Sequence, residues 1–285
     1  MEIKVNECAG KDSIRYGKVV TFDMTMDIFP DKRTRTIRVW LPAGYDGMRR
    51  FPVLYMHDAQ NLFEGCDVGS REKWCINQEM ETLEKEGLPA IIVGIDTAPT
   101  RFEELCPPIS TNPDVYDMFG LSGTFVPNGD LYAGFITGQL KTYVDTRFLT
   151  LTEQANTAVG GASMGGLISL YILLKYPSVF SKAMVFAPNF MIHYEFDMLS
   201  KLALYDFRTL LEHRIFIFHG GLTIDALNWP FTQKIYETMR DKGMDDTHLA
   251  LLYDSRQPHY ESAWRKYFAE AFRYLFLEDN ATVKS

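Results

Sequence analysis

The chain has 285 residues, of which 46% are hydrophobic and 14% aromatic. This apolar content is enough for a large core and excludes a disordered chain, and a single α/β domain over residues 1–285 is of ordinary size. The 29 basic and 37 acidic side chains give a net charge of −8. A nucleic-acid-binding surface needs the opposite charge, so we expect small-molecule partners and no nucleic acid.

The predicted elements begin with two alternating segments, residues 19–29 and 33–42, joined by the turn residues Pro30-Asp31-Lys32. They predict an antiparallel hairpin. Six short apolar runs follow, which are typical of strands buried on both faces: 52–58, 90–96, 156–161, 182–188, 214–221 and 248–254. Helical periodicity lies at about 74–86, 130–147, 164–176, 195–211, 230–243 and 258–277. The alternation predicts an α/β fold with a mostly parallel sheet of about eight strands and helices on both faces.

Residues 97–129 lack this regularity and are rich in Pro, Gly, Ser, Thr and Asn. A long irregular loop inside a compact domain is usually functional or mobile. We therefore interpret it as a candidate substrate loop. Its aromatic side chains, with those nearby, either stack on a substrate ring or pack the loop onto the sheet: Phe63, Phe102, Tyr116, Phe119, Phe125 and Trp229.

No stretch reaches about 18 apolar residues, and the N-terminus lacks a basic segment followed by an apolar one. We therefore expect no membrane association and a cytoplasmic location. The cysteines at positions 8, 66, 75 and 106 include no C-x-x-C pair, which favours reduced thiols over a Cys66–Cys75 bridge. The six histidines are scattered, without an H-E-x-x-H motif, so the sequence indicates neither a metal nor a cofactor.

Gly161-Ala162-Ser163-Met164-Gly165 fits the pattern G-x-S-x-G between a predicted strand and a predicted helix. In this pattern the small residues let the chain turn sharply and expose the serine hydroxyl. The amides at the start of the following helix also suit a developing oxyanion. The pattern therefore favours Ser163 as a nucleophile over a plain glycine-rich turn.

A serine nucleophile needs a base, which follows it in the chain order serine, acid, histidine. His259 comes after the last predicted strand and is the favoured base. His193, His213 and His248 are in positions that suit surface or structural roles, and His219 ends a strand.

The acid should follow the strand before the last one, where Asp225 is the only carboxylate before Glu237. Asp225 lies in a predicted loop, where turn or capping roles are common. Asp254, at the end of the last strand, is the alternative acid.

The oxyanion hole should come from an earlier loop together with the residue after the nucleophile. The segment MHDAQNLF, residues 56–63, follows a strong strand. We expect the amides around Asp58 and Ala59, with that of Met164, to form this hole. The carboxylate of Asp58 either binds substrate or only orders the loop.

These segments together resemble the putative esterase family of α/β-hydrolases, which includes feruloyl, acetylxylan and enterochelin-type esterases and mycolyltransferases. The similarity is carried by RVWLPAGYDGMRRFPVLYMHDAQNLF, VGIDTAPTRFEELCPP, GGASMGGLISLYILLKYPSVF and HYESAW. The resemblance implies an α/β-hydrolase fold with Ser163 as nucleophile and His259 as base. It places Asp58, Gln60, Asn61 and Arg101 near the substrate. Ala59, Tyr260 and the segment HGGLTID depart from the family's pattern.

We therefore predict a serine esterase that hydrolyses carboxylic esters through an acyl-enzyme. On resemblance, its substrates are acylated sugars or other small acyl esters. A siderophore-type or thioester hydrolase and a non-catalytic binding protein on the same fold are the alternatives.

Overall fold

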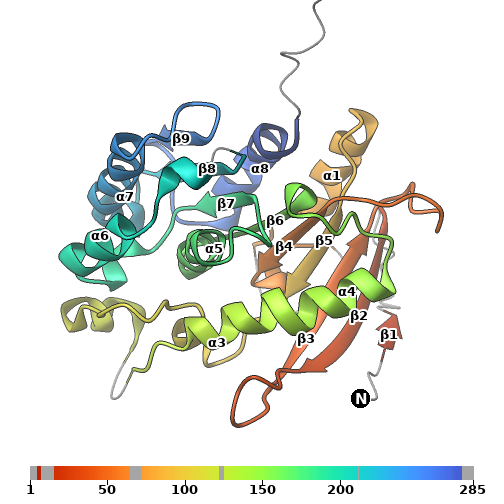
Figure 1. Cartoon of the computed structure of the whole chain (residues 1–285), viewed down its shortest axis with the longest axis horizontal. Helices are drawn as coiled ribbons and strands as arrows, with labels where there is room; N and C mark the ends of the chain where they lie inside the picture. Colours follow the sequence, from red (N-terminus) through yellow and green to blue (C-terminus); the bar gives the residue numbers. More distant parts are fainter. Residues whose placement is uncertain (1–4, 8–15, 65–71, 122–124, 211, 278–285) are drawn as a thin grey trace, which may run out of the picture.

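The computed structural model describes residues 5–7, 16–64, 72–121, 125–210 and 212–277. These residues form a nine-stranded sheet with helices packed on it (Figure 1). In spatial order the strands are β1 (Val5–Glu7), β2 (Lys18–Thr25), β3 (Thr34–Leu41), β5 (Ile91–Ile95), β4 (Val53–His57), β6 (Thr157–Ala162), β7 (Lys182–Phe186), β8 (Arg214–Gly220) and β9 (Leu249–Asp254). The strands from β5 to β9 run parallel, and β1, β2 and β3 pair antiparallel.

The predicted fold class and hairpin are confirmed. The six apolar runs are the parallel strands, and every residue of β4, β5 and β6 is buried because helices cover both faces. The two alternating segments are β2 and β3, which pair over their full lengths. The short edge strand β1 was not predicted, since three residues carry too little pattern.

Helices on the two faces enclose two separate hydrophobic cores. Alternate strand residues such as Leu54 and Ile92 pack with α1 (Ile76–Lys85) and α8 (Glu261–Phe276). The residues between them, such as Val53 and Val93, pack with helices on the other face (Figure 1). Those helices are α3 (Gly129–Gly134), α4 (Lys141–Arg147), α5 (Met164–Lys175), α6 (Glu195–Ala203) and α7 (Ile224–Asp241). The two-residue period of the strands thus sorts the side chains between the cores.

Two helices differ from their predicted bounds. The helix predicted over 195–211 ends at Ala203 as α6, and a separate 3₁₀ segment, Phe207–Leu210, follows it. The segment predicted as a helix from 230 begins at Ile224 and passes through Pro230. Proline is favoured in a first turn, which is why the sequence pattern suggested a start there. The earlier start places Asp225 in the first turn of α7, so it is not a loop residue as predicted. A π-helical turn, Phe135–Leu140, joins α3 to α4 within the predicted helix 130–147.

The predicted loop at 97–129 contains two short helical segments in its described part, α2 (Arg101–Glu104) and a 3₁₀ segment, Pro113–Phe119. Its aromatic rings pair with one another, Phe102 with Phe119 at 5.7 Å and Tyr116 with Phe125 at 5.6 Å between centroids. All four are partly buried against the larger core. The packing interpretation of these aromatics is therefore the one that the structure supports.

Close packing between α5 and β7 predicts a large difference between two glycines. A Cβ atom on Gly166 would lie 2.8 Å from the carbonyl oxygen of Phe186, whereas a Cβ atom on Gly138 would meet no atom within 4 Å. Gly166→Ala should destabilise the protein by about 1–3 kcal/mol, because the backbone at Phe186 cannot move away without a large cost in free energy. Gly138→Ala should be neutral or stabilising by up to about 1 kcal/mol. Urea unfolding measures both, and equal stabilities would contradict this packing.

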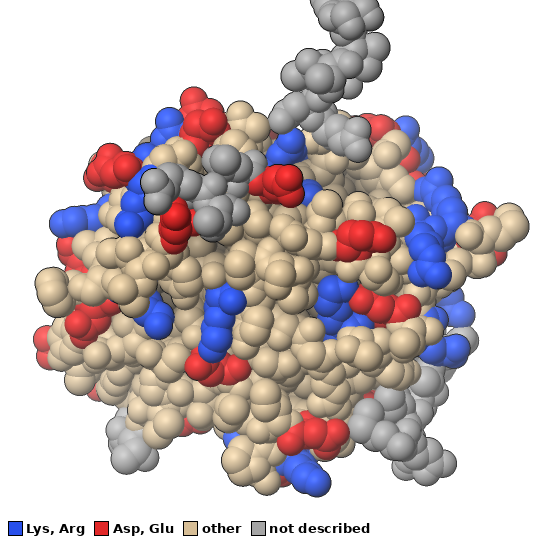
Figure 2. Space-filling model, viewed as in Figure 1, with Lys and Arg blue, Asp and Glu red and all other residues tan. Residues whose placement is uncertain are grey.

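Surface features add little that points to a particular partner. On the face in Figure 2, acidic and basic side chains are interspersed among uncharged residues. None of the helices in the described ranges is long and apolar enough to cross a bilayer. Cys75 and Cys106 are free thiols, and the Cys66 of the alternative bridge lies outside the described residues.

Candidate active site

Ser163 occupies a sharp turn between the end of β6 and the start of α5. Its backbone angles are φ 60° and ψ −123°, a conformation that costs energy for a residue with a side chain. The surrounding backbone holds it there: the Ser163 amide donates to the Phe186 carbonyl at 2.9 Å, and the Ser163 carbonyl accepts from Asn189 at 3.1 Å. The serine is therefore fixed at the carboxyl end of the sheet.

His57 packs behind the two glycines of the G-x-S-x-G segment. A Cβ atom on Gly161 would lie 3.0 Å from Cδ2 of His57, and one on Gly165 would lie 3.4 Å from its Cβ. Position 161 therefore favours a residue without a side chain if the turn is to rest on β4, whereas a Cβ atom at position 165 would be in ordinary van der Waals contact.

His259 and Asp225 meet at the same end of the sheet. Nδ1 of His259 lies 2.6 Å from Oδ1 of Asp225, which is fully buried. The backbone amide of His259 donates to Oγ1 of Thr223 at 3.0 Å. The ring also meets the edge of Trp264, with 5.0 Å between centroids. These contacts fix the orientation of the imidazole ring. Nε2, the second ring nitrogen, takes part in none of them.

Asp254, the alternative acid, is occupied by other partners. It accepts a hydrogen bond from Tyr267 at 2.6 Å and one from Gln257 at 3.1 Å. The Tyr267 hydroxyl, with further donors from Arg256, holds the pKa of Asp254 well below its usual range. The structure thus brings Asp225, and not Asp254, to His259.

Ser163 and His259 line one cavity of about 390 Å³. Four of the five predicted substrate contacts line it too: Asp58, Gln60, Asn61 and Arg101. The remaining lining residues were not predicted: His57, Trp74, Ala162, Glu261 and Trp264. Glu261 and Trp264 belong to the segment HYESAW, so their position close to His259 in the sequence could have indicated them. Ligand sites of parallel sheets commonly lie at this carboxyl end.

Asp58 and Arg101 form a two-point ion pair in the cavity wall. Nε and Nη2 of Arg101 donate to the two carboxylate oxygens at 2.6 and 2.8 Å. Burial alone would raise the pKa of Asp58, but the adjacent guanidinium holds it below its ordinary value. The loop is fixed further by the Thr97 amide, which donates to Oε1 of Gln60 at 3.1 Å. Asp58 therefore orders the loop while it also faces the cavity.

Ala59 and Met164, the predicted oxyanion donors, each occupy the first position of a helical segment. Ala59 opens the 3₁₀ turn Ala59–Asn61, and Met164 opens α5 directly after Ser163. A first-position amide has no carbonyl to bond within its own helix. Both amides are thus placed to donate to a group outside their helices.

Comparison with known proteins assigns the chain to a family. A sequence profile described as Putative esterase matches residues 31–194, more than half of the chain. The chain belongs to this esterase family. The matched range includes Ser163 and ends before Asp225 and His259. The family resemblance of the sequence is thereby confirmed, and membership supports a hydrolase.

Relatives of this esterase-family chain are distant. The uncharacterized protein YbbA from Bacillus subtilis is 23% identical over 262 residues, which cover 87% of this chain and 95% of YbbA. A ferulic acid esterase has a TM-score of 0.66 at 15% identity, over 91% of this chain and 98% of that one. The feruloyl esterase module from Clostridium thermocellum, complexed with sinapinate, has a TM-score of 0.66 at 18% identity, over 98% and 95%. The enterobactin esterase FES from Shigella flexneri has a TM-score of 0.66 at 16% identity, and the match spans 90% of this chain but 58% of FES. At these identities the solved structures establish the fold.

Trp229, the remaining predicted substrate contact, is not among the lining residues of this cavity. It lies one turn after Asp225 in α7 and stacks on Tyr253, with 3.9 Å between ring centroids. It also packs against the buried His219. Phe63 is fully buried in the core beside α1. The structure thus places these two aromatic side chains in packing roles.

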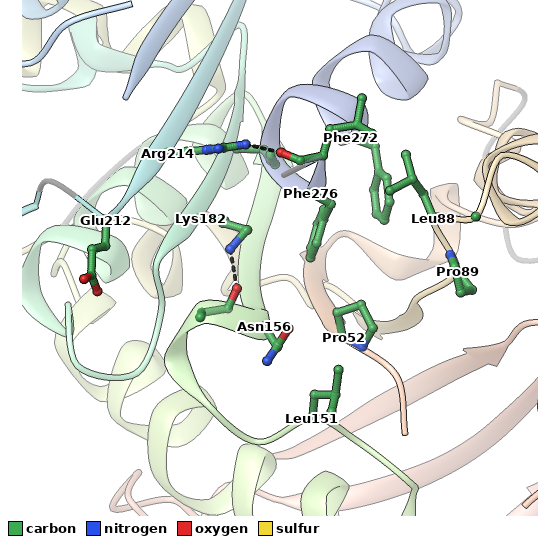
Figure 3. Close-up of a pocket in the computed structure, with 14 residues that line it drawn as sticks. Pro52, Leu88, Pro89, Leu151, Asn156, Lys182, Glu212, Arg214, Phe272 and Phe276 are labelled. Carbon is green, nitrogen blue, oxygen red and sulfur yellow. Dashed lines mark hydrogen bonds between the residues drawn. The ribbon is translucent and has the colours of Figure 1, made fainter. Parts of the chain in front are cut away.

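A second cavity of about 460 Å³ lies at the other end of the sheet from Ser163 (Figure 3). Lys182 and Arg214 on its wall are the first residues of β7 and β8, and Phe272 and Phe276 come from the end of α8. Lys182 Nζ bonds the Ala155 carbonyl, and Arg214 bonds the Leu277 carbonyl. These cations therefore tie chain segments together at the sheet's amino end.

Two buried histidines predict a loss of stability in acid. Burial lowers the pKa of His57 and that of His193 from 6.5 to about 4. The unfolded chain therefore binds protons that the folded protein does not, so stability falls as the pH falls from about 6.5 towards 4. Each histidine should contribute a loss of about 2 kcal/mol between pH 7 and 5.

Urea unfolding of the wild type and of His193→Gln at pH 7 and 5 measures this loss. The variant should lose about 2 kcal/mol less than the wild type, because the titrating carboxylates are common to both proteins. Equal losses would mean that His193 takes up a proton without unfolding.

Proposed function

We propose that this protein is a serine esterase that hydrolyses small carboxylic esters through an acyl-enzyme. The observation that carries the proposal is that Ser163 and His259 face one cavity while His259 is bonded to the buried carboxylate of Asp225. A serine needs a base to become nucleophilic, and the base needs a partner that fixes its tautomer. The three residues follow β6, β8 and β9, in the chain order of α/β-hydrolases.

The reaction has two halves. Nε2 of His259 accepts the proton of the Ser163 hydroxyl as its oxygen attacks the ester carbonyl. The amides of Ala59 and Met164 stabilise the oxyanion, and His259 returns the proton to the departing alcohol. Water, deprotonated by His259, then attacks the acyl-Ser163 ester; the bond to the Ser163 oxygen breaks as His259 returns the proton to that oxygen, and the carboxylic acid leaves. The buried Asp225 stabilises the imidazolium in both halves.

Acylated sugars are our first proposed substrate class. The cavity presents polar groups of Asp58, Gln60 and Asn61 together with the indole rings of Trp74 and Trp264. Such a combination of hydrogen-bonding groups and aromatic faces suits a hydroxylated ring. Two of the structural relatives are described as feruloyl or ferulic acid esterases.

A siderophore-type ester is the second candidate, favoured by the fold shared with the enterobactin esterase FES. A panel of acetylated sugars, ferulate esters, a catecholate trilactone and thioesters would rank these classes by kcat/KM.

A cytoplasmic location is also a proposal. It would limit the substrates to esters present inside the cell, and cell fractionation tests it.

A fluorophosphonate probe tests the reaction class. Intact-mass analysis should show one adduct on the wild type and none on Ser163→Ala, because only an activated serine reacts. A wild-type protein that stays unlabelled would favour the alternative of a non-catalytic binding protein on this fold.

A further inference from the structure

The active-site cavity contains one carboxylate that the proposed reaction does not use, that of Glu261. It is the first residue of α8, two positions after His259, and lines the same cavity as Ser163. Asn61 Nδ2 donates to its Oε1 at 3.0 Å. Since Asn61 belongs to the loop after β4, Glu261 is held between two elements that both frame the cavity.

The cavity's other carboxylates have basic partners. Asp58 is paired with Arg101, and Asp225, behind His259, is bonded to its imidazole. No ion pair joins Glu261 to a basic side chain within the described ranges. Burial raises the pKa of Glu261, and the nearby carboxylates of Glu72 and Asp58 raise it further. An ionised Glu261 therefore leaves negative charge at the cavity that no ion pair of its own neutralises, since the guanidinium of Arg101 is bonded to Asp58.

Three more polar atoms at this cavity are unused. Nε2 of His57, Oδ1 of Asn61 and Nε1 of Trp264 are buried and have no hydrogen-bond partner among the described residues. Buried polar atoms without partners cost free energy, which a bound ligand recovers where a small shift of these side chains brings the atoms to the cavity surface. One acceptor from Asn61, one donor from Trp264 and the acceptor oxygens of Glu261 together match a group with several hydroxyls.

We propose that Glu261 is a specificity-determining residue that favours esters with uncharged, hydroxyl-bearing groups and excludes esters with an anionic group. The proposal rests on the proposed esterase function of the same site. The anion is excluded by repulsion from the partly buried Glu261 carboxylate, because charges near a protein interior interact more strongly than in bulk water. The hydroxyls are favoured because they satisfy the Glu261 and Asn61 oxygens.

Two substrate ratios test the proposal at pH 8, which keeps the carboxylate ionised. The first compares kcat/KM for 4-nitrophenyl butyrate and mono-4-nitrophenyl succinate, which differ by one carboxylate. The second compares glycerol monoacetate with propyl acetate, which differ by two hydroxyls. Each ratio is measured on one protein sample, so a misfolded fraction cancels.

Glu261→Gln should lower the neutral-to-anionic ratio about tenfold, because it removes the charge and keeps an acceptor for Asn61. It should also lower the preference for the hydroxylated ester. Glu270→Gln is the matched control: Glu270 is an exposed residue of the same helix that does not line the cavity, and both ratios should stay at the wild-type values.

The two proposals fail in distinguishable ways. If the wild type cleaves these esters but Glu261→Gln and Glu270→Gln give the same two ratios, the role of Glu261 is overturned and the esterase stands. If the wild type cleaves none of the four esters faster than Ser163→Ala does, the esterase function itself is overturned.

Discussion

Replacing Ser163 by alanine should lower kcat for 4-nitrophenyl acetate by at least about 10³-fold. Without its oxygen no acyl-enzyme can form, and only binding and the oxyanion donors remain to accelerate attack by water. The fold should persist, because Ser163 is held by backbone hydrogen bonds to Phe186 and Asn189 that alanine keeps. Alanine also tolerates the backbone angles no worse than serine does.

Initial rates and circular dichroism of the wild type and Ser163→Ala measure this effect. Ser178→Ala is the control, since Ser178 is exposed and does not line the cavity. Comparable hydrolysis by the wild type and Ser163→Ala would remove Ser163 from the reaction.

Asp225→Asn should also produce a large effect, a decrease of about 10³- to 10⁴-fold in kcat. The carboxylate accepts a hydrogen bond from the N–H at Nδ1 of His259 at 2.6 Å, which leaves Nε2 free to take the serine proton. An amide donor in this place would favour the other tautomer, in which Nε2 carries a proton and cannot accept one. The loss should therefore appear in kcat even with the protein fully folded.

The same substitution at Asp254 separates the two acids. Asp254→Asn should change kcat less than about threefold, because Asp254 is bonded to Tyr267 and Gln257 and not to His259. It should affect stability more than rate, through the lost hydrogen bonds on α8. A large kcat loss in Asp254→Asn, with Asp225→Asn active, would reverse the assignment.

The parallel sheet could be predicted because strands buried on both faces must be continuously apolar. The run PVLYMHD and the run AIIVGID became β4 and β5 nearly residue for residue. The start of α7 could not be predicted, since Pro230 is a strong local signal for a helix start. The structure overrides that signal at the cost of one backbone hydrogen bond, while packing against β8 extends the helix back to Ile224.

The site residues likewise include some that the sequence could predict and some that it could not. Ser163 and His259 could be proposed from local patterns, the strand–turn–helix context and the position after the last strand. The acid could not be decided, because Asp225 and Asp254 both follow strands and only the three-dimensional packing brings one of them to His259. The role of the aromatic residues could not be decided either. The sequence around Trp229 looks the same whether its ring stacks on Tyr253 or on a substrate.

The short helix α2 links the antiparallel strands to the active-site loop. At its start Arg101 holds Asp58, and at its end Glu104 is held by Arg33 and Arg35 of the hairpin. Oγ1 of Thr100 also donates to Glu104 at 2.7 Å. The helix thus connects the two sets of ion pairs. Through it the hairpin stabilises the wall of the candidate active site, although the hairpin does not line the cavity. Substitutions on the outer strands would therefore change the affinity for substrate, although these strands lie far from any reacting atom.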